Sequence, residues 1–197
     1  MRIIAGSKRG RRLVDWEESG IRPVRDFVRS ALFNIVDDFV DGAVCLDLYA
    51  GTGSLGLEAL SRGARRCLFV DRAPEACAIV RRNLAAFDLL EAGEVFEGDA
   101  VAAIDRFSRR GRRFDLVFLD PPYQLGAVPA TLRALGDGRA LASDPVVVAA
   151  ASVAETPEPG CGRLRLADRR RYGDNQLLFY RLDKSKPNDP DERTEDA

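Results

Sequence analysis

The stretch DLYAGTGSLG, residues 47–56, decides the fold of this chain. It places glycines at positions 51, 53 and 56, the G-x-G-x-x-G spacing, between an apolar run typical of a buried strand and a helical stretch. Glycines there allow a tight turn and a close approach of the backbone to a ligand, and the helix that follows offers free N–H groups. A strand, a glycine turn and a helix in this order predict an α/β sheet with a ligand at the carboxyl ends of its strands.

Outward from this stretch, short apolar runs alternate with helical segments. Strands are expected at residues 43–50, 67–71, 94–100, 114–120 and 145–153, and helices at 54–62, 74–87, 101–110 and 126–136. Strands separated by helices of this length imply a parallel sheet that is covered on both faces. Two more strands on either side of Gly173 should form an antiparallel pair at one edge. The sequence therefore predicts an α/β, Rossmann-like fold with a seven-stranded sheet and an antiparallel edge.

The two ends of the chain differ from this pattern. Residues 1–20 read as short extended segments around SKRG, which predicts a hairpin. From Phe27 to Phe39, apolar residues recur at steps of three and four, the pattern of an amphipathic helix that docks on a core. We expect a small N-terminal extension over residues 1–24, a Rossmann-like domain over 25–182 and a disordered acidic tail over 183–197, where apolar residues are almost absent.

Composition narrows the chemistry that this chain can perform. With 197 residues, 46% of them hydrophobic and 31% charged, the chain has the length and balance of one globular domain. No run approaches the roughly 18 apolar residues of a membrane span, and the first residues lack the order of a secretory signal, so we expect a cytoplasmic protein with no membrane partner. The chain has no histidine and no CxxC pair, which argues against Ser/His/Asp and Cys/His nucleophiles, a disulfide framework and a metal site.

Local charge says more about partners than the formal net charge of −1 does. The tail, residues 183–197, holds six acids against three bases, whereas residues 1–30 hold eight cations against four acids. A basic N-terminal region predicts contact with the phosphates of a nucleic acid. The candidate RNA-contacting residues are Arg2, Lys8, Arg9, Arg11, Arg12, Arg22 and Arg25.

Three carboxylates near the glycine turn indicate which ligand it takes. Asp71 ends the second expected strand, 20 residues after Gly51, where it could accept hydrogen bonds from two ribose hydroxyls. Asp47, four residues before Gly51, could meet an ammonium group but would repel a pyrophosphate. Asp99 follows the third expected strand, where it could accept from an adenine amine. A ribose, an adenine and an amino-acid ammonium together describe S-adenosylmethionine.

The candidate cofactor-binding residues lie at the ends of the first three expected strands. They are Asp47, Tyr49, Ala50, Gly51, Thr52, Gly53, Asp71, Arg72, Asp99 and Ala100. Other interpretations stay open at this point: the glycine turn could be purely geometric, and Asp71 and Asp99 could each cap the helix that follows. A nicotinamide-dependent oxidoreductase would use the glycines and Asp71 but would leave Asp47 without a role.

The sequence LDPPYQ, residues 119–124, ends the fourth expected strand. Asp120 and the carbonyl oxygen of Pro121 could accept from the hydrogens of an exocyclic amine, which would direct its delocalised lone pair toward a methyl sulfonium. The two prolines, Pro121 and Pro122, restrict φ and so fix the direction of that carbonyl. Tyr123 could stack on a base pulled from its helix. The simpler alternative is a Pro-Pro turn capped by Asp120, with Tyr123 packing on the core.

Taken together, these motifs resemble the RsmD-type methyltransferases of bacterial 16S ribosomal RNA, which modify a guanine exocyclic amine. The resemblance covers residues 1 to about 182 and includes MRIIAG with GRRL, RPVRDFVRSALFNIV, DLYAGTGSLGLEALSRGA, FVD, GDA and DPPY. The N-terminal motifs narrow the match, because many amino-methyltransferases share the glycine turn and DPPY. The chain departs from the family pattern at Val24, Phe27, Ser30 and Asn175.

The resemblance implies a class I S-adenosylmethionine-dependent methyltransferase whose N-terminal extension touches RNA and whose substrate is presented in the assembling small ribosomal subunit. We expect the protein to be a monomer. Competing hypotheses are an adenine or cytosine amino-methyltransferase acting on DNA, a protein amide methyltransferase and a non-catalytic RNA-binding module. The basic N-terminus favours a nucleic acid over a protein substrate, and the chain is short for a DNA enzyme with a separate recognition domain.

Overall fold

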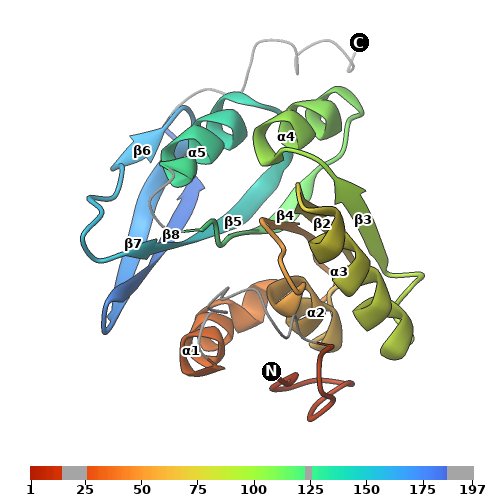
Figure 1. Cartoon of the computed structure of the whole chain (residues 1–197). Helices are drawn as coiled ribbons and strands as arrows, with labels where there is room; N and C mark the ends of the chain where they lie inside the picture. The colour runs from red at the N-terminus through yellow and green to blue at the C-terminus, as the bar shows by residue number, and fades with distance from the viewer. Residues whose placement is uncertain (15–25, 123–125, 186–197) are drawn as a thin grey trace.

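The protein is built around one eight-stranded sheet with strand order β3-β2-β1-β4-β5-β8-β7-β6 (Figure 1). The computed structural model describes residues 1–14, 26–122 and 126–185. The strands are β1 (Val44–Leu48), β2 (Arg66–Asp71), β3 (Gly93–Glu97), β4 (Phe114–Leu119), β5 (Leu141–Ser152), β6 (Gly160–Cys161), β7 (Leu164–Tyr172) and β8 (Asn175–Leu182). Strands β1 to β5 pair in parallel, and β8 pairs antiparallel with both β5 and β7.

The prediction of a seven-stranded sheet was wrong by one strand. The extra strand is β6, whose two residues pair antiparallel with the start of β7, Cys161 opposite Leu164. A segment of two residues is too short to show the alternation of apolar and polar side chains that marks a strand. The antiparallel edge predicted around Gly173 is formed by β7 and β8, with β6 added outside it.

Helices cover both faces of the sheet, as Figure 1 shows. On one face lie α1 (Asp26–Val36), the short 3-10 helix η1 (Asp37–Phe39), α2 (Ser54–Ser61) and α3 (Pro74–Ala86). On the other face lie α4 (Ala100–Arg109) and α5 (Ala127–Asp137). Side chains alternate between the faces, so Cys45 of β1 packs in the first core and Leu46 in the second. A sheet buried on both sides accounts for its continuous apolar strands.

The first fourteen residues fold back on themselves and pack on the first core. Arg2 and Arg12 form an isolated antiparallel bridge, and the backbone N–H of Gly10 donates to the carbonyl oxygen of Ile3 at 2.9 Å. Ile3 and Leu13 are buried in the same cluster as α1 and α2. The predicted hairpin is therefore reduced here to a single bridge, and the rest of the predicted extension, residues 15–24, lies outside the described residues.

Most of the predicted acidic tail, residues 186–197, also lies outside the described part of the chain. None of the helices in that part is both long enough and apolar enough to span a membrane.

Candidate active site

The register of the sheet brings the predicted site residues to one edge. Leu48 of β1 lies opposite Val70 of β2 and Leu119 of β4, so the residues that follow these three leave the sheet at the same level. The next strand continues this edge, because the N–H of Gly98 donates to the carbonyl oxygen of Asp71 at 2.9 Å. The carboxyl ends of β1, β2, β3 and β4 therefore meet where an open α/β sheet binds its ligand.

The three glycines after β1 have two different roles. Gly51 and Gly53 have φ angles of 55° and 78°, in the left-handed region that favours glycine. Gly56 lies inside α2, where a Cβ atom would come within 2.3 Å of the Phe69 ring and 2.5 Å of the Cys67 sulfur. The first two glycines thus shape the loop, and the third lets α2 pack closely on β2. Tyr49 also has a positive φ of 62°, an uncommon conformation for a side chain of this size.

Asp71 holds the glycine loop against the start of α3. One carboxylate oxygen accepts from the N–H of Gly51 and the other from the N–H of Ala73, both at 2.9 Å. Because each carboxylate oxygen has more than one acceptor site, both keep capacity for a ligand hydroxyl. Asp71 is therefore a structural brace whose carboxylate is still open to a ligand.

Asp47 is more deeply placed than the sequence suggested. Its side chain is 1% exposed, and its Oδ2 accepts from the N–H of Gly56 at 2.9 Å. Burial raises the pKa of this carboxyl well above its usual range, the Gly56 hydrogen bond opposes the shift, and the charges of Asp120 and Asp71 add to it. Asp47 fixes the first turn of α2, and the contact with a ligand ammonium stays a prediction.

Asn83 of α3 connects the glycine loop to the N-terminal segment. Its buried Nδ2 donates to the carbonyl oxygens of Thr52 at 3.1 Å and Val14 at 3.2 Å, and its Oδ1 accepts from the N–H of Val14 at 2.7 Å. The sequence analysis missed this residue. The signal that could have found it is an amide side chain on the apolar face of an amphipathic helix, where burial requires hydrogen-bond partners.

Asp99 and Tyr49 lie near each other at the edge beside the glycine loop. Asp99 caps α4, because its Oδ1 accepts from the N–H of Ala102 at 3.0 Å, so the helix-cap interpretation is present in the structure. The Tyr49 hydroxyl lies 2.7 Å from the Thr131 hydroxyl. Burial raises the pKa of Tyr49, the Thr131 hydrogen bond lowers it, and the nearby charge of Asp99 raises it. Among the other candidates, Arg72 is exposed, Thr52 is half-buried, and Ala50 and Ala100 are buried.

The turn after β4 presents a carboxylate that is not engaged. Asp120 is half-buried, and no residue in the described ranges donates a hydrogen bond to its carboxylate. Burial raises the pKa of the Asp120 carboxyl to about 7. Pro121 is buried and Pro122 is exposed. Tyr123, the last residue of the predicted catalytic set, lies outside the described residues.

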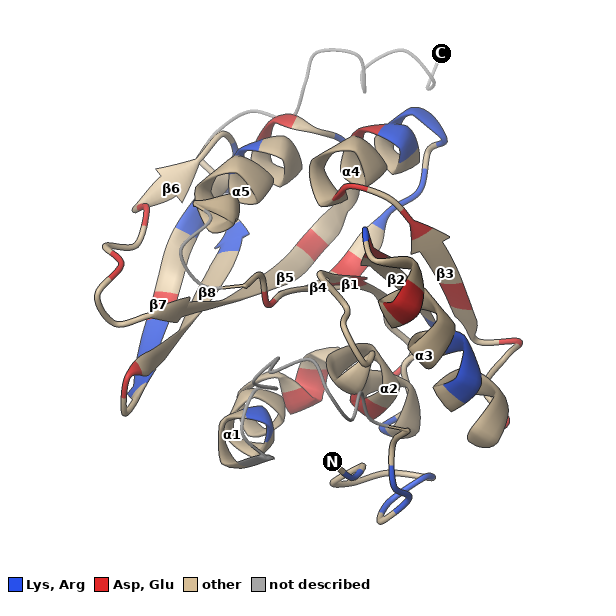
Figure 2. Cartoon of the chain, in the orientation of Figure 1, with Lys and Arg blue, Asp and Glu red and all other residues tan. Residues whose placement is uncertain are grey.

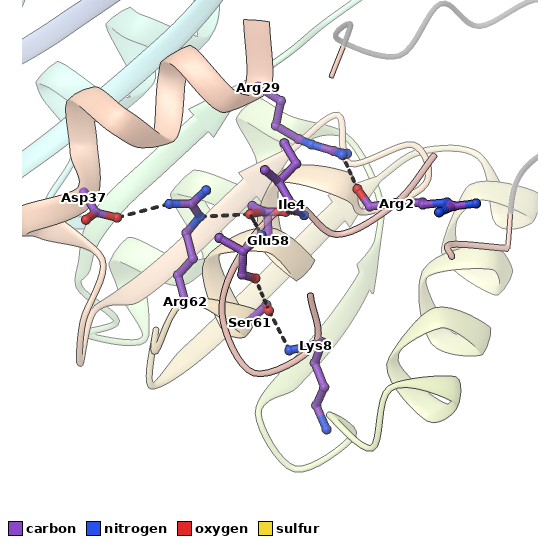
Figure 3. A network of polar contacts seen from close by, with 9 residues as sticks. Arg2, Ile4, Lys8, Arg29, Asp37, Glu58, Ser61 and Arg62 are labelled. Carbon is purple, nitrogen blue, oxygen red and sulfur yellow. Dashed lines mark hydrogen bonds and ion pairs between the residues drawn. The ribbon is translucent and has the colours of Figure 1, made fainter. Parts of the chain in front are cut away.

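The predicted RNA-contacting segment is fastened to α2 by Glu58, as Figure 3 shows. The fully buried carboxylate of Glu58 accepts from the N–H groups of Ile4 at 2.8 Å and Ala5 at 3.0 Å. Its Oε1 also accepts from Nε of Arg62 at 2.9 Å, and Nη1 of Arg62 reaches Asp37 at 3.1 Å. These contacts join the N-terminal segment, the end of α2 and η1.

Ser61 and Arg29 add further links to the same segment (Figure 3). The Ser61 hydroxyl donates to the carbonyl oxygen of Ala5 at 2.6 Å and accepts from the N–H of Lys8 at 2.9 Å. Arg29, which is buried in α1, donates through Nη2 to the carbonyl oxygen of Arg2. The hydrogen bonds that hold the segment to α1 and α2 thus come from its backbone, and its charged side chains take no part in them.

Two of the predicted N-terminal cations, Lys8 and Arg11, have an ionic partner in Asp88. Nζ of Lys8 lies 3.9 Å from Asp88 and Nη1 of Arg11 lies 3.3 Å from it, and the Arg11 guanidinium also lies 5.3 Å from the centre of the Phe87 ring. The exposed predicted cations are Arg2, Arg9, Arg11 and Arg12. Arg22 and Arg25 lie outside the described residues.

Comparisons with known proteins agree with this arrangement. The model of the family described as conserved hypothetical protein 95 matches residues 1–181. The chain is 37% identical to YlbH of Bacillus subtilis (strain 168) over 182 residues, which cover 92% of this chain and 98% of YlbH. It is 36% identical over 149 residues to ribosomal RNA small subunit methyltransferase D of Escherichia coli (strain K12), which is 75% of this chain and 72% of that protein. The solved structure of yhhF from Escherichia coli has a TM-score of 0.80 and 30% identity, covering 92% of this chain and 97% of its own.

The strand order, the glycine loop and these neighbours define a class I methyltransferase fold. Within that class, the chain belongs to the conserved hypothetical protein 95 family, the family of the RsmD-type methyltransferases, as the sequence predicted.

Proposed function

We propose that this protein transfers a methyl group from S-adenosylmethionine to the exocyclic amine of a guanine in 16S ribosomal RNA. The observation that carries the proposal is the single sheet edge on which the glycine loop, the braced Asp71 and the unengaged Asp120 lie together. The substrate follows from the family, since the Escherichia coli relative is named a small-subunit ribosomal RNA methyltransferase.

The cofactor-binding half uses groups that the fold already holds in place. In this proposal Asp71 accepts from the ribose hydroxyls with the lone pairs that Gly51 and Ala73 do not use. Asp99 accepts from the adenine amine with the carboxylate oxygen that does not cap α4. The remaining residues that would line the cofactor are Tyr49, Ala50, Thr52, Gly53, Arg72 and Ala100, with Asp47 near the ammonium group.

The fit of the site to this cofactor can be judged from its charges. S-adenosylmethionine supplies an electrophilic methyl group on a positively charged sulfonium. The charges of three carboxylates interact here, those of Asp47, Asp71 and Asp120. Because Asp47 is buried, keeping it ionised beside the other two costs free energy unless a cation is bound. A cationic ligand would lower the raised pKa of Asp47 and of Asp120 and favour their ionised forms.

Catalysis in this proposal needs a hydrogen-bond acceptor at Asp120. The ionised carboxylate and the carbonyl oxygen of Pro121 accept from the two hydrogens of the amine, which directs the nitrogen lone pair toward the methyl carbon. The new N–C bond forms as the S–C bond breaks, and the electron pair of that bond stays on sulfur. The product amine is then cationic and releases its proton to Asp120 or to water. Tyr123 is assigned to stacking on the target base.

The substrate would reach this edge as part of an assembling small ribosomal subunit, with the protein acting as a cytoplasmic monomer. Residues 1–24 would contact RNA through exposed N-terminal cations such as Arg9 and Arg12, while residues 25–182 carry the chemistry. The backbone ties to Glu58 and Asn83 support this division of labour, because they fix the segment relative to the glycine loop.

Small-subunit particles from a strain that lacks this gene provide the direct test. We expect the purified protein and labelled S-adenosylmethionine to methylate one guanine, which primer extension and mass mapping of the ribosomal RNA would locate. Duplex DNA and ribosomal proteins serve as parallel substrates. Methylation of DNA or protein in place of ribosomal RNA would contradict the proposal, and so would cofactor binding or RNA binding without any transfer.

A further inference from the structure

An aromatic pair lies where α1 meets the turn between β7 and β8. The Phe27 ring is 72% exposed and packs edge-on against Tyr172, with 5.9 Å between ring centroids and 77° between ring planes. Tyr172 is half-buried against the first core, so Phe27 is held in place while most of its ring faces solvent. A single exposed aromatic side chain is common on protein surfaces, so its surroundings decide what it means.

Those surroundings are rich in arginine. Arg170 and Arg171 directly precede Tyr172 and are exposed, and Figure 2 shows β7 in the colour of Lys and Arg near its turn with β8. Arg170 donates through Nε to Asp168 at 2.8 Å, whereas the guanidinium of Arg171 has no hydrogen bond or ion pair with any residue of the described ranges. Asp174 is the acid on the turn itself. Successive side chains of a strand point to opposite faces of the sheet, so Arg170 lies on the face of Tyr172 and Phe27, and Arg171 lies on the other face of the tip of this hairpin.

The sheet register places this tip at the proposed active edge. Leu119 lies opposite Ala149, Ala149 opposite Leu178, and Leu178 opposite Arg169. Strands β4 and β7 run in the same direction, so one residue further along both strands Asp120 and Arg170 lie at the same level. Arg171 and Tyr172 extend beyond that level. Three strand spacings separate β4 from β7, or about 14 Å. The turn between β7 and β8 thus lies at the same edge of the sheet as Asp120, three strands away from it.

We propose that Phe27, Tyr172, Arg170 and Arg171 form a second RNA surface, which holds unpaired nucleotides next to the target guanine. Phe27 stacks on a base, Arg170 neutralises a phosphate on the same face, and Arg171 neutralises the next phosphate where the strand passes the tip; stacking with cationic neutralisation is the combination by which proteins bind single strands. The free face of an exposed ring can stack on a nucleobase, and nearby guanidinium groups can bind its phosphate. An enzyme that moves a base out of its helix must bind the unpaired strand next to that base. This proposal rests on the proposed function and adds the way in which the substrate is positioned.

The test compares variants that differ in one property each. Phe27→Leu keeps an apolar side chain but removes the ring, and R170A/R171A removes two cations. The matched control is R65A/R66A. These two exposed arginines lie at the amino end of β2, whereas the proposed active edge lies at the carboxyl ends of the strands. Thermal melting and calorimetric binding of S-adenosylmethionine should be the same in all four proteins, which establishes that each variant is folded.

RNA affinity is then measured without cofactor, on single-stranded 16S fragments and on under-methylated particles, as a function of salt. We expect Phe27→Leu to weaken binding about tenfold or more, and R170A/R171A to reduce the slope of log affinity against log salt by about 1.4, since each phosphate contact to a single strand contributes roughly 0.7. R65A/R66A should resemble the wild type. If Phe27→Leu and R170A/R171A both keep the wild-type affinity and salt slope, the second RNA surface is wrong. A loss of affinity for particles but not for single-stranded RNA would also overturn it, because it would indicate a ribosomal protein partner. If the wild-type protein binds RNA through Phe27 but transfers no methyl group, the proposed function is wrong and the second RNA surface is not.

Discussion

The loop after β1 and the turn after β4 lie at the same sheet edge, yet the chain equips them differently. Hydrogen bonds to Asp71 and Asn83 fix the glycine loop, and a hydrogen bond to Asp47 fixes the first turn of α2 that follows it. The Asp120 carboxylate accepts no hydrogen bond from any residue that the structure describes, and burial raises its pKa to about 7. The difference suggests that the cofactor half is organised before a ligand binds, whereas the substrate half keeps its acceptor free for the amine.

The largest expected effect is the loss of that free acceptor. Asp120→Ala should reduce methyl transfer at least about a hundredfold, the scale of removing one positioned catalytic group. Asp120→Asn keeps one oxygen that can accept from the amine and should retain measurable transfer. Single-turnover assays on under-methylated particles would measure this step without interference from product release.

The same pair of variants separates an acceptor from a base. Both should bind S-adenosylmethionine as the wild type does, which calorimetry would establish. If Asn and Ala are equally inactive while cofactor binding is intact, an ionised base must replace the acceptor in the mechanism. Full activity of Asp120→Ala would mean that the Asp-Pro-Pro segment is only a turn.

On the organised side, Asp71→Ala should weaken S-adenosylmethionine binding by roughly ten- to a hundredfold for each ribose hydrogen bond lost, because hydrogen bonds to a charged group contribute about 1.5–3 kcal/mol each. The substitution also removes the bonds from the Gly51 and Ala73 N–H groups. Asp168→Ala is a suitable control, since this half-buried carboxylate lies on the distant strand β7. Titration calorimetry would measure the affinity of Asp71→Ala for S-adenosylmethionine. An affinity within twofold of the wild type would show that Asp71 does not bind the cofactor.

The raised pKa of Asp120 gives a smaller effect, with a definite sign. The acceptor is the ionised carboxylate, so single-turnover transfer should rise with pH and level off, with its midpoint below the pKa of about 7 that the ligand-free site gives Asp120, because the cationic cofactor favours the ionised form. Below that midpoint the rate should fall about tenfold for each pH unit. Asp120→Asn should show no such dependence. A flat profile in the wild type would mean that the bound cofactor keeps Asp120 ionised throughout.

The smallest expected effect concerns the predicted N-terminal contacts. Replacing Lys8, Arg9, Arg11 and Arg12 with Ala should lower RNA affinity and reduce its salt slope. Lys8 and Arg11 already have an ionic partner in Asp88, so R9A/R12A should account for more of the change than K8A/R11A. Equal slopes for wild type and the fourfold variant would assign these side chains to a solvated surface.

Sequence reasoning succeeded where the information is local. The spacing of Gly51 and Gly53 indicated a turn that the left-handed φ angles confirm, and the position of Asp71 at a strand end follows from the pattern of apolar residues. It failed where partners are far apart in the chain. Glu58 bonds residues 53 and 54 positions away, and Asn83 bonds a residue 69 positions away, and no periodicity reports such contacts.

Two further differences have physical causes of their own. The depth of Asp47 depends on how α2 packs over β1, and a motif cannot show this packing. The pairing of Phe27 with Tyr172 joins residues from opposite ends of the domain, which only the folded sheet brings together. The amphipathic pattern around Phe27 predicted that this side chain would be buried, whereas it lies at the start of α1 with most of its ring in solvent.

The attachment of the first fourteen residues to Glu58 and Asn83 sets an order of events during protein synthesis. At about 5–20 residues per second, the ribosome needs about 3 to 14 s to reach Asn83 after it has made Val14, its partner 69 positions earlier. Throughout that interval Val14 has been translated but its partner Asn83 has not. The last tie of the N-terminal segment therefore forms only after at least 69 further residues have been made, although the segment is the first part of the chain to be made.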